Sequence, residues 1–82
     1  MNRILLNDYY KAIEDATKRE LNESLTVTLK QLYKLAQFSA INYQDQGLQE
    51  FFQILALLCK KFLKTNEGIE NIKNHIQQLS LA

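Results

Sequence analysis

Apolar residues recur at intervals of three and four along most of this chain, the spacing that places them on one face of an α-helix. Four such stretches can be followed, over residues 3–21, 24–41, 46–64 and 67–79. The connections between them span only about two to six residues, which makes consecutive helices antiparallel neighbours. The pattern predicts an all-α fold, an antiparallel up-down bundle of about four helices. A pair of helical hairpins completed by a second subunit is the alternative.

The apolar stripes of the four stretches differ in width and clarity. The third stretch has the clearest one, made of Leu48, Phe51, Phe52, Leu55, Leu58, Cys59 and Phe62. The fourth has a narrow seam typical of coiled coils, made of Ile69, Ile72, Ile76 and Leu79. Near the start of the second, residues 26–28 favour a strand. The helical spacing of Leu25, Leu29, Leu32, Ala36 and Ala40 outweighs that preference.

Polar residues next to these stretches predict how the helices begin and which side chains pair. Asn22 or Ser24 is the expected N-cap of the second helix, and Asn66 of the fourth, because their side-chain oxygens can accept a bond from a free backbone N–H. Glu14 and Lys18 are spaced i,i+4 with the acid first, the favourable order for an ion pair on one helix. The first helix therefore has one polar, solvent-facing side.

Length and composition indicate one globular domain over residues 1–82. The chain is 46% hydrophobic and 23% charged, a balance that argues against disorder. A core of this size supplies little net stability without a disulfide, a metal or oligomerisation. Cys59 is the single cysteine and His75 the single histidine, so an intrachain disulfide is impossible and a metal site is not expected. Well-packed helices or oligomerisation remain as possible sources of stability.

Charge and hydropathy weigh against nucleic acids and membranes as partners. The formal net charge is +1, whereas phosphate binding depends on concentrated lysine and arginine. The longest uninterrupted apolar run, residues 54–59, is far shorter than the roughly 20 residues that span a bilayer. The apolar run at residues 4–6 is too short for a signal peptide. We expect a cytoplasmic protein with no nucleic-acid partner and no stable membrane insertion.

The sequence offers little for catalysis. Cys59 lies in an apolar stripe, where a thiol is usually an inert small hydrophobe. His75 flanks the seam of the fourth stretch, a position similar to the phosphoacceptor of histidine phosphotransfer domains. Residues 76–78, Ile-Gln-Gln, replace the lysine and glycine that characteristically follow that histidine. No Glu-x-x-His pair and no phosphate-binding loop is present. We expect no catalytic, cofactor-binding or metal-binding residues, and therefore no enzyme.

Several apolar residues fall outside the main stripes of the two central helices. On a wheel of about 100° per residue, Leu57 lies about 200° and Ile54 about 260° from Leu55. Relative to Leu32, Val27 and Phe38 lie at about 220° and 240°, and Ile41 near 180°. Either an irregular bundle buries them against the first or fourth helix, or they form a surface for a partner or a second copy. The candidate interface residues are Val27, Phe38, Ile54 and Leu57.

Together these features favour a small non-enzymatic interaction protein, an adaptor, regulator or inhibitor that docks a helical face on a protein partner or on itself as a homodimer. The alternative is an intracellular immunity-type protein that protects a producer bacterium from its own peptide toxin, since many of these are small antiparallel helical bundles. That alternative rests on size and architecture alone. Frequent Asn, Lys, Ile and Gln suggest a bacterial or phage source.

Overall fold

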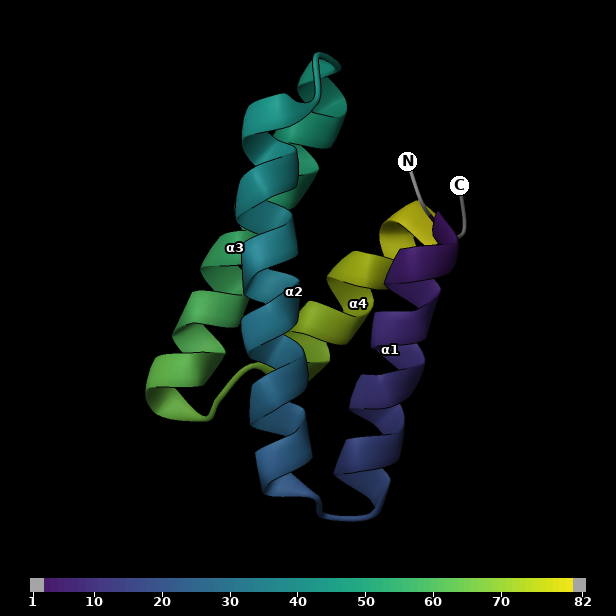
Figure 1. The fold of residues 1–82 in the computed structure, drawn as a ribbon, viewed down its shortest axis with the longest axis vertical. Coiled ribbons are helices and arrows are strands. Elements are labelled where there is room, and N and C mark those ends of the chain that lie inside the picture. The colour runs from purple at the N-terminus through teal and green to yellow at the C-terminus, as the bar shows by residue number, and fades with distance from the viewer. Residues whose placement is uncertain (1–2, 81–82) are drawn as a thin grey trace.

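The computed structural model describes residues 3–80, and these form four α-helices with no strand among them (Figure 1). The helices are α1 (Arg3–Lys18), α2 (Asn22–Asn42), α3 (Gln46–Thr65) and α4 (Ile69–Ser80). The prediction of an all-α fold with four helices is therefore confirmed. Each helix lies within about three residues of the stretch that predicted it, because the apolar spacing marks the helices better than it marks their ends.

The helices are arranged so that α2 and α3 keep an uncovered outer side. α1 packs against α2 and α4, α4 packs against α1 and α3, and α2 and α3 pack against each other. Figure 1 shows α1, α2 and α3 alternating in direction, while α4 rises obliquely behind α2 and ends near the start of α1. In the same view the end of the α2–α3 hairpin (residues 22–65) extends past α1 and α4. Neither α1 nor α4 lies over its outer side.

The first helix ends three residues earlier than its apolar pattern suggests. Glu20 has a φ of 55°, in the left-handed region, and this reverses the chain after Lys18. The backbone N–H of Leu21 donates to the carbonyl of Ala16 at 2.8 Å, and that of Glu20 donates to Thr17 at 3.2 Å. These are the two hydrogen bonds of a Schellman ending, which satisfies carbonyls that the helix itself leaves free.

The prediction that Asn22 or Ser24 caps the start of α2 is wrong. Asn22 and Ser24 both lie inside the helix, and the residue at the cap position is Leu21, which makes no side-chain hydrogen bond. The tight turn at Glu20 leads directly into α2 and leaves no room for a separate polar cap. A side-chain cap forms instead at α3, where Asp45 Oδ1 accepts from the backbone N–H of Leu48 at 3.0 Å.

The prediction that Asn66 caps the fourth helix is also wrong. Asn66 closes α3: it has a φ of 59°, and its backbone N–H donates to the carbonyl of Phe62 at 2.7 Å. Asparagine tolerates this left-handed conformation better than most residues. Gly68 follows with a φ of 96°, which only glycine adopts without strain. The α3–α4 turn therefore uses both residues, and α4 begins at Ile69 rather than at residue 67.

The core forms where the apolar stripes of the four helices meet. Every one of its members is less than 9% exposed, and those of α2, α3 and α4 lie in the stripes predicted from the spacing. These residues are Leu6, Ile13 and Ala16 of α1, Leu25, Leu29, Leu32 and Ala36 of α2, Phe52, Leu55, Cys59 and Phe62 of α3, and Ile72 and Ile76 of α4. Burial of these side chains is the main source of stability, since apolar burial is the dominant favourable term in folding.

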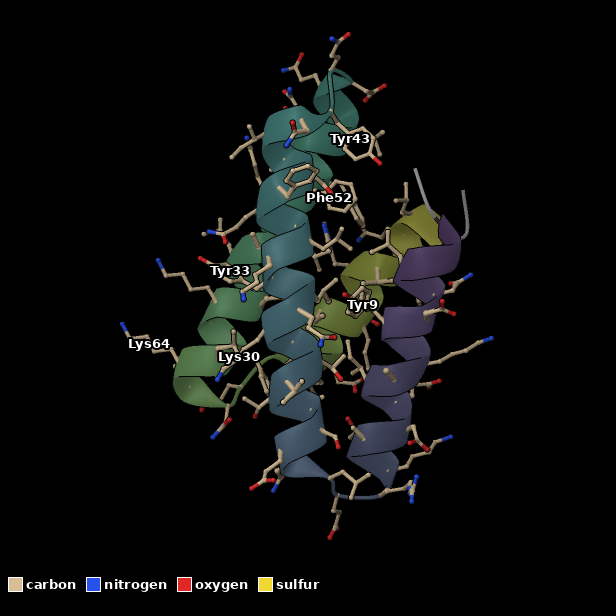
Figure 2. All side chains as sticks on the ribbon, in the orientation of Figure 1. Tyr9, Lys30, Tyr33, Tyr43, Phe52 and Lys64 are labelled. Carbon is tan, nitrogen blue, oxygen red and sulfur yellow. The ribbon has the colours of Figure 1, made fainter. Side chains whose placement is uncertain are left out.

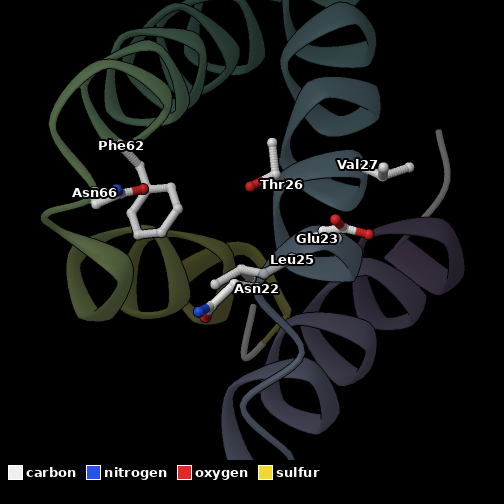
Figure 3. A pocket seen from close by; sticks show the side chains of 7 residues that line it. All are labelled: Asn22, Glu23, Leu25, Thr26, Val27, Phe62 and Asn66. Carbon is white, nitrogen blue, oxygen red and sulfur yellow. The ribbon is translucent and has the colours of Figure 1, made fainter.

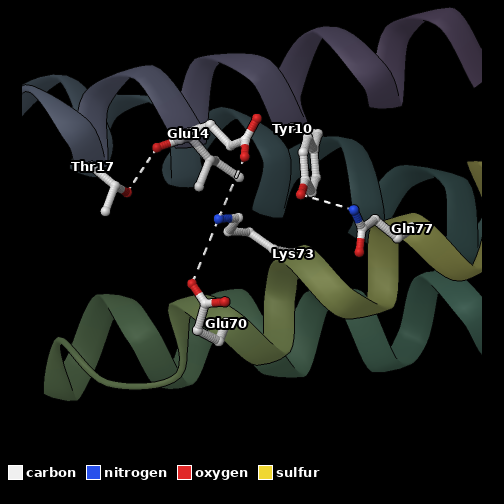
Figure 4. Close-up of polar contacts among 7 residues, drawn as sticks. Tyr10, Glu14, Thr17, Glu70, Lys73 and Gln77 are labelled. Atoms are coloured by element: carbon white, nitrogen blue, oxygen red, sulfur yellow. Dashed lines mark hydrogen bonds and ion pairs between the residues drawn. The ribbon is translucent and has the colours of Figure 1, made fainter.

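An ion-pair cluster joins α4 to α1 beside this core (Figure 4). Lys73 Nζ lies 3.8 Å from Glu14 Oε2 and 3.6 Å from Glu70 Oε2, and it sits 5.7 Å from the centre of the Tyr10 ring. The amide of Gln77 donates to the Tyr10 hydroxyl at 2.8 Å. Glu14 thus pairs with a lysine of another helix rather than with Lys18, the partner that local spacing predicted. Tertiary packing decided this contact.

An aromatic series joins the far end of the α2–α3 hairpin to α4. Tyr43 and Phe52 stack with their ring centres 5.6 Å apart, as the upper part of Figure 2 shows. Phe51 meets Phe52 edge-on at 5.2 Å and stacks on His75 of α4 at 4.3 Å. Such pairs add to the free energy gained from burial alone. They hold the projecting end of the hairpin against the rest of the molecule.

Candidate functional site

The four candidate interface residues are all exposed. Their side chains are 54% (Val27), 65% (Phe38), 46% (Ile54) and 66% (Leu57) accessible to solvent. Oblique packing against α1 or α4 therefore does not bury them, and the helical wheel placed them correctly away from the main stripes. Their role as an interface stays a prediction.

The structure does not bring these four residues together on one face. Leu57 lines a groove between α2 and α3, whereas Phe38 and Ile54 lie outside it. Val27 borders a different hollow near the start of α2. On the wheel of α3, Ile54 projects on the opposite side of the helix from Ala56, which lies in the groove. Of the four candidates, only Leu57 belongs to the α2–α3 groove.

The α2–α3 groove is a hollow of about 520 Å³ on the outer side of the hairpin. Its apolar part consists of Ile41, Leu57, Ala40 and Ala56. Ile41 is the most exposed large hydrophobic residue of the described chain, at 80%, and it is missing from the candidates. Its wheel position near 180° was the available signal. The half-buried Ala40 and Ala56 could not be found in this way, since their side chains matter only because the two helices meet there.

A second hollow, of about 610 Å³, lies between the start of α2 and the end of α3 (Figure 3). Phe62 and Leu25 provide its apolar walls, and Asn22, Glu23, Thr26 and Asn66 provide its polar ones. Glu23 is its one ionisable group. This set offers neither a nucleophile beside a base nor a group of metal ligands, so we assign it no chemistry.

Cys59 is fully buried in the core, in agreement with its place in the apolar stripe of α3. Burial raises the pKa of the Cys59 thiol to about 12, because the thiolate would lose its hydration. The thiolate is the nucleophilic form of cysteine. A residue held in the thiol form and closed off from solvent has a packing role.

His75 is likewise engaged in packing. It is 8% exposed, its ring stacks on Phe51, and its Nε2 lies 2.8 Å from the carbonyl oxygen of Phe51. A carbonyl can only accept, so Nε2 carries the hydrogen and donates it. The sequence had placed His75 at the edge of the α4 seam. The structure gives it a role in joining α4 to α3.

We expect His75→Ala to lower the free energy of unfolding by about 2 kcal/mol, since it removes a buried hydrogen bond and an aromatic contact. Urea denaturation followed by far-UV circular dichroism measures this difference. Gln78→Ala is the matched control, because Gln78 is an exposed residue of the same helix. Equal stability of the two variants would show that His75 does not contribute to the α3–α4 contact.

Residues 3–80 contain neither a cluster of metal-ligating side chains nor a helix that could span a membrane. No three His, Cys, Asp or Glu side chains of this part of the chain lie close enough to hold a metal ion. None of its helices combines the length and the hydropathy needed to cross a bilayer. The α2–α3 groove differs from the second hollow in that exposed large hydrophobic residues, Ile41 and Leu57, line it.

Comparison with known proteins adds no family to this description. The chain matches no protein-family model, no curated protein and no solved structure at a significant level.

Proposed function

We propose that this chain is a non-enzymatic interaction protein, an adaptor, regulator or inhibitor that docks the outer side of its α2–α3 hairpin on another protein. The observation that carries the proposal is the distribution of exposed apolar side chains. Of the six large hydrophobic residues that are exposed in the described chain, five lie on this hairpin: Val27, Phe38, Ile41, Ile54 and Leu57. Exposed apolar side chains are typical of protein-binding surfaces, and two of the five, Ile41 and Leu57, share the α2–α3 groove.

The state of the two candidate reactive residues supports binding over catalysis. Cys59 is closed off in the core, and His75 is held by Phe51. Both side chains serve the fold, and a binding role needs neither of them. We place the activity in the cytosol, where a lone thiol stays reduced.

Charged substitutions at the exposed apolar positions test the proposal. We expect Leu57→Asp and Phe38→Asp to remove a stoichiometric partner that the tagged wild-type protein retains from a lysate of its own source, membranes included. Far-UV helicity and the thermal midpoint should stay close to those of the wild type, since both side chains are more than 60% exposed. Ala12→Asp, at an exposed position of α1, is the matched control and should keep the partner.

The identity of the partner then separates the forms of the proposal. A soluble protein supports an adaptor or regulator, and retention of a second copy alone supports a homodimer. A membrane transporter supports the self-protection role. If both variants keep every partner of the wild type, the hairpin is not the docking surface and the proposal is wrong. If they unfold, Phe38 and Leu57 belong to the core and the proposal is also wrong.

A further inference from the structure

The α2–α3 hairpin carries a block of positive charge that its own acids do not neutralise. Half of the ten lysine and arginine residues of the chain lie here, on exposed positions: Lys30, Lys34, Lys60, Lys61 and Lys64. Residues 24–44 and 51–66 contain no aspartate or glutamate. In the part of the chain that the structure describes, ion pairs involve Arg19 and Lys73 but none of these five lysines. The near-zero net charge of the whole chain conceals this block.

The lysines lie beside the apolar residues of the α2–α3 groove, and Lys60 is itself part of its lining. Lys30 and Lys34 precede Ile41 by about two to three helical turns, and Lys60 and Lys64 follow Leu57 by about one to two turns. Since α2 and α3 run in opposite directions, Lys34, eight residues before the end of α2, lies nearer to Tyr43 than Leu57, eleven residues after the start of α3. Figure 2 shows this order, with Tyr43 at one end, then Tyr33, then Lys30 and Lys64. Leu57 therefore lies among the lysines, and Lys60 lines the groove together with it.

The floor of the groove is suited to a helix. Ala40 and Ala56 are its small residues, and small side chains allow the backbones of packed helices to approach closely. Tyr33, Gln37 and Gln53 add polar groups to the lining, and the Gln37 amide donates to the Tyr33 hydroxyl at 2.9 Å. A hydrophobic groove between two helices is a common seat for an amphipathic helix.

We infer that the α2–α3 groove binds an amphipathic α-helix of a protein partner, one whose apolar stripe is flanked by acidic residues. The apolar stripe of that helix contacts Ile41 and Leu57, and its acids face Lys30, Lys34, Lys60 and Lys64 beside them. This inference rests on the proposed function and adds the chemistry of the partner. An anionic membrane is disfavoured because a flat surface would not use a concave floor of alanines.

A set of designed peptides tests the inference directly. The probe is a 21-residue helix with leucines at i, i+3, i+4 and i+7 along one face and four glutamates on the two flanks of that face, labelled for fluorescence anisotropy. A second peptide carries lysines in place of the glutamates, and a third carries serines in place of the leucines. We expect the first peptide to bind at least tenfold more tightly than either of the others at low salt, with an affinity that falls as salt is added.

Variants of the protein locate the binding. Lys34→Gln with Lys60→Gln should weaken the first peptide at least fivefold and flatten the salt dependence, while Lys11→Gln with Lys18→Gln on α1 should change neither. Ala56→Leu fills the floor and should abolish binding. Leu57→Asp should also abolish binding. Leu57 is exposed and this variant leaves the half-buried alanines unchanged, so loss of binding in both variants could not be explained by a folding defect of Ala56→Leu.

Three results would overturn the inference: equal binding of the acidic and basic peptides, binding that survives both Ala56→Leu and Leu57→Asp, or no binding of any peptide. Tighter binding of the wild type to vesicles of phosphatidylserine and phosphatidylcholine than to the first peptide would assign the surface to a membrane instead. A natural partner that depends on Leu57 but not on Lys34, Lys60 or salt would leave the proposed function standing and this inference wrong.

Discussion

Replacing Phe52 by alanine is expected to cost ~3–5 kcal/mol of unfolding free energy, the range for loss of a fully buried aromatic side chain. Phe52 is 1% exposed and contacts both Tyr43 and Phe51, so its removal leaves a cavity at the point where the hairpin meets α4. A helical domain of this size has only about 5 kcal/mol or slightly more to lose. We therefore expect Phe52→Ala to be partly unfolded at 37 °C, as thermal denaturation followed by circular dichroism would show.

Phe38→Ala is the control for this prediction, because it makes the same chemical change at an exposed position. Its unfolding free energy should lie within about 0.5 kcal/mol of the wild type. Comparable losses at the two positions would mean that Phe38 is buried in solution by a contact between copies of the chain. Sedimentation of the wild type would then show a dimer. Comparable stability at both positions would contradict the core described for α3.

Cys59 should be almost inert to thiol reagents in the folded protein. With a pKa of about 12, only about one molecule in ten thousand carries the thiolate at pH 8, against about one in ten for an unperturbed thiol. Reaction with Ellman's reagent should be at least a thousandfold slower in buffer than in concentrated urea. In Phe52→Ala the rate should rise sharply, because the unfolded state exposes the thiol and is more populated. Fast modification of the folded wild type would contradict the burial of Cys59.

The raised pKa of Cys59 also predicts how stability depends on pH. The folded protein holds the thiol proton more tightly than the unfolded chain, whose thiol has its usual pKa near 9. This contribution to stability is fully present below pH 9 and is lost as the pH rises through about 12, because the unfolded chain releases the proton first. Cys59→Ala should show a weaker loss over this window. Other groups titrate there as well, and the variant separates their effect from that of the thiol.

The candidate site was only partly accessible to prediction from sequence. The helical wheel found that Val27, Phe38, Ile54 and Leu57 face away from the core, because that depends only on the 100° step within one helix. It could not show that Leu57 shares a groove with Ile41 while Phe38 does not, because this depends on which sides of α2 and α3 meet. The net charge of +1 did not reveal the lysine block, since net charge does not report where charges lie along the chain.

The sequence by itself determined the all-α class, the four helices and the membership of the core. The reason is that apolar and polar residues alternate along the chain with the period of an α-helix, 3.6 residues. It did not determine the helix ends at Glu20 and Asn66, where backbone conformation decides, nor the pairing of Glu14 with Lys73. Local spacing describes one helix at a time. Contacts between α1 and α4 and the groove between α2 and α3 arise only when separate helices pack, and only the tertiary structure decided them.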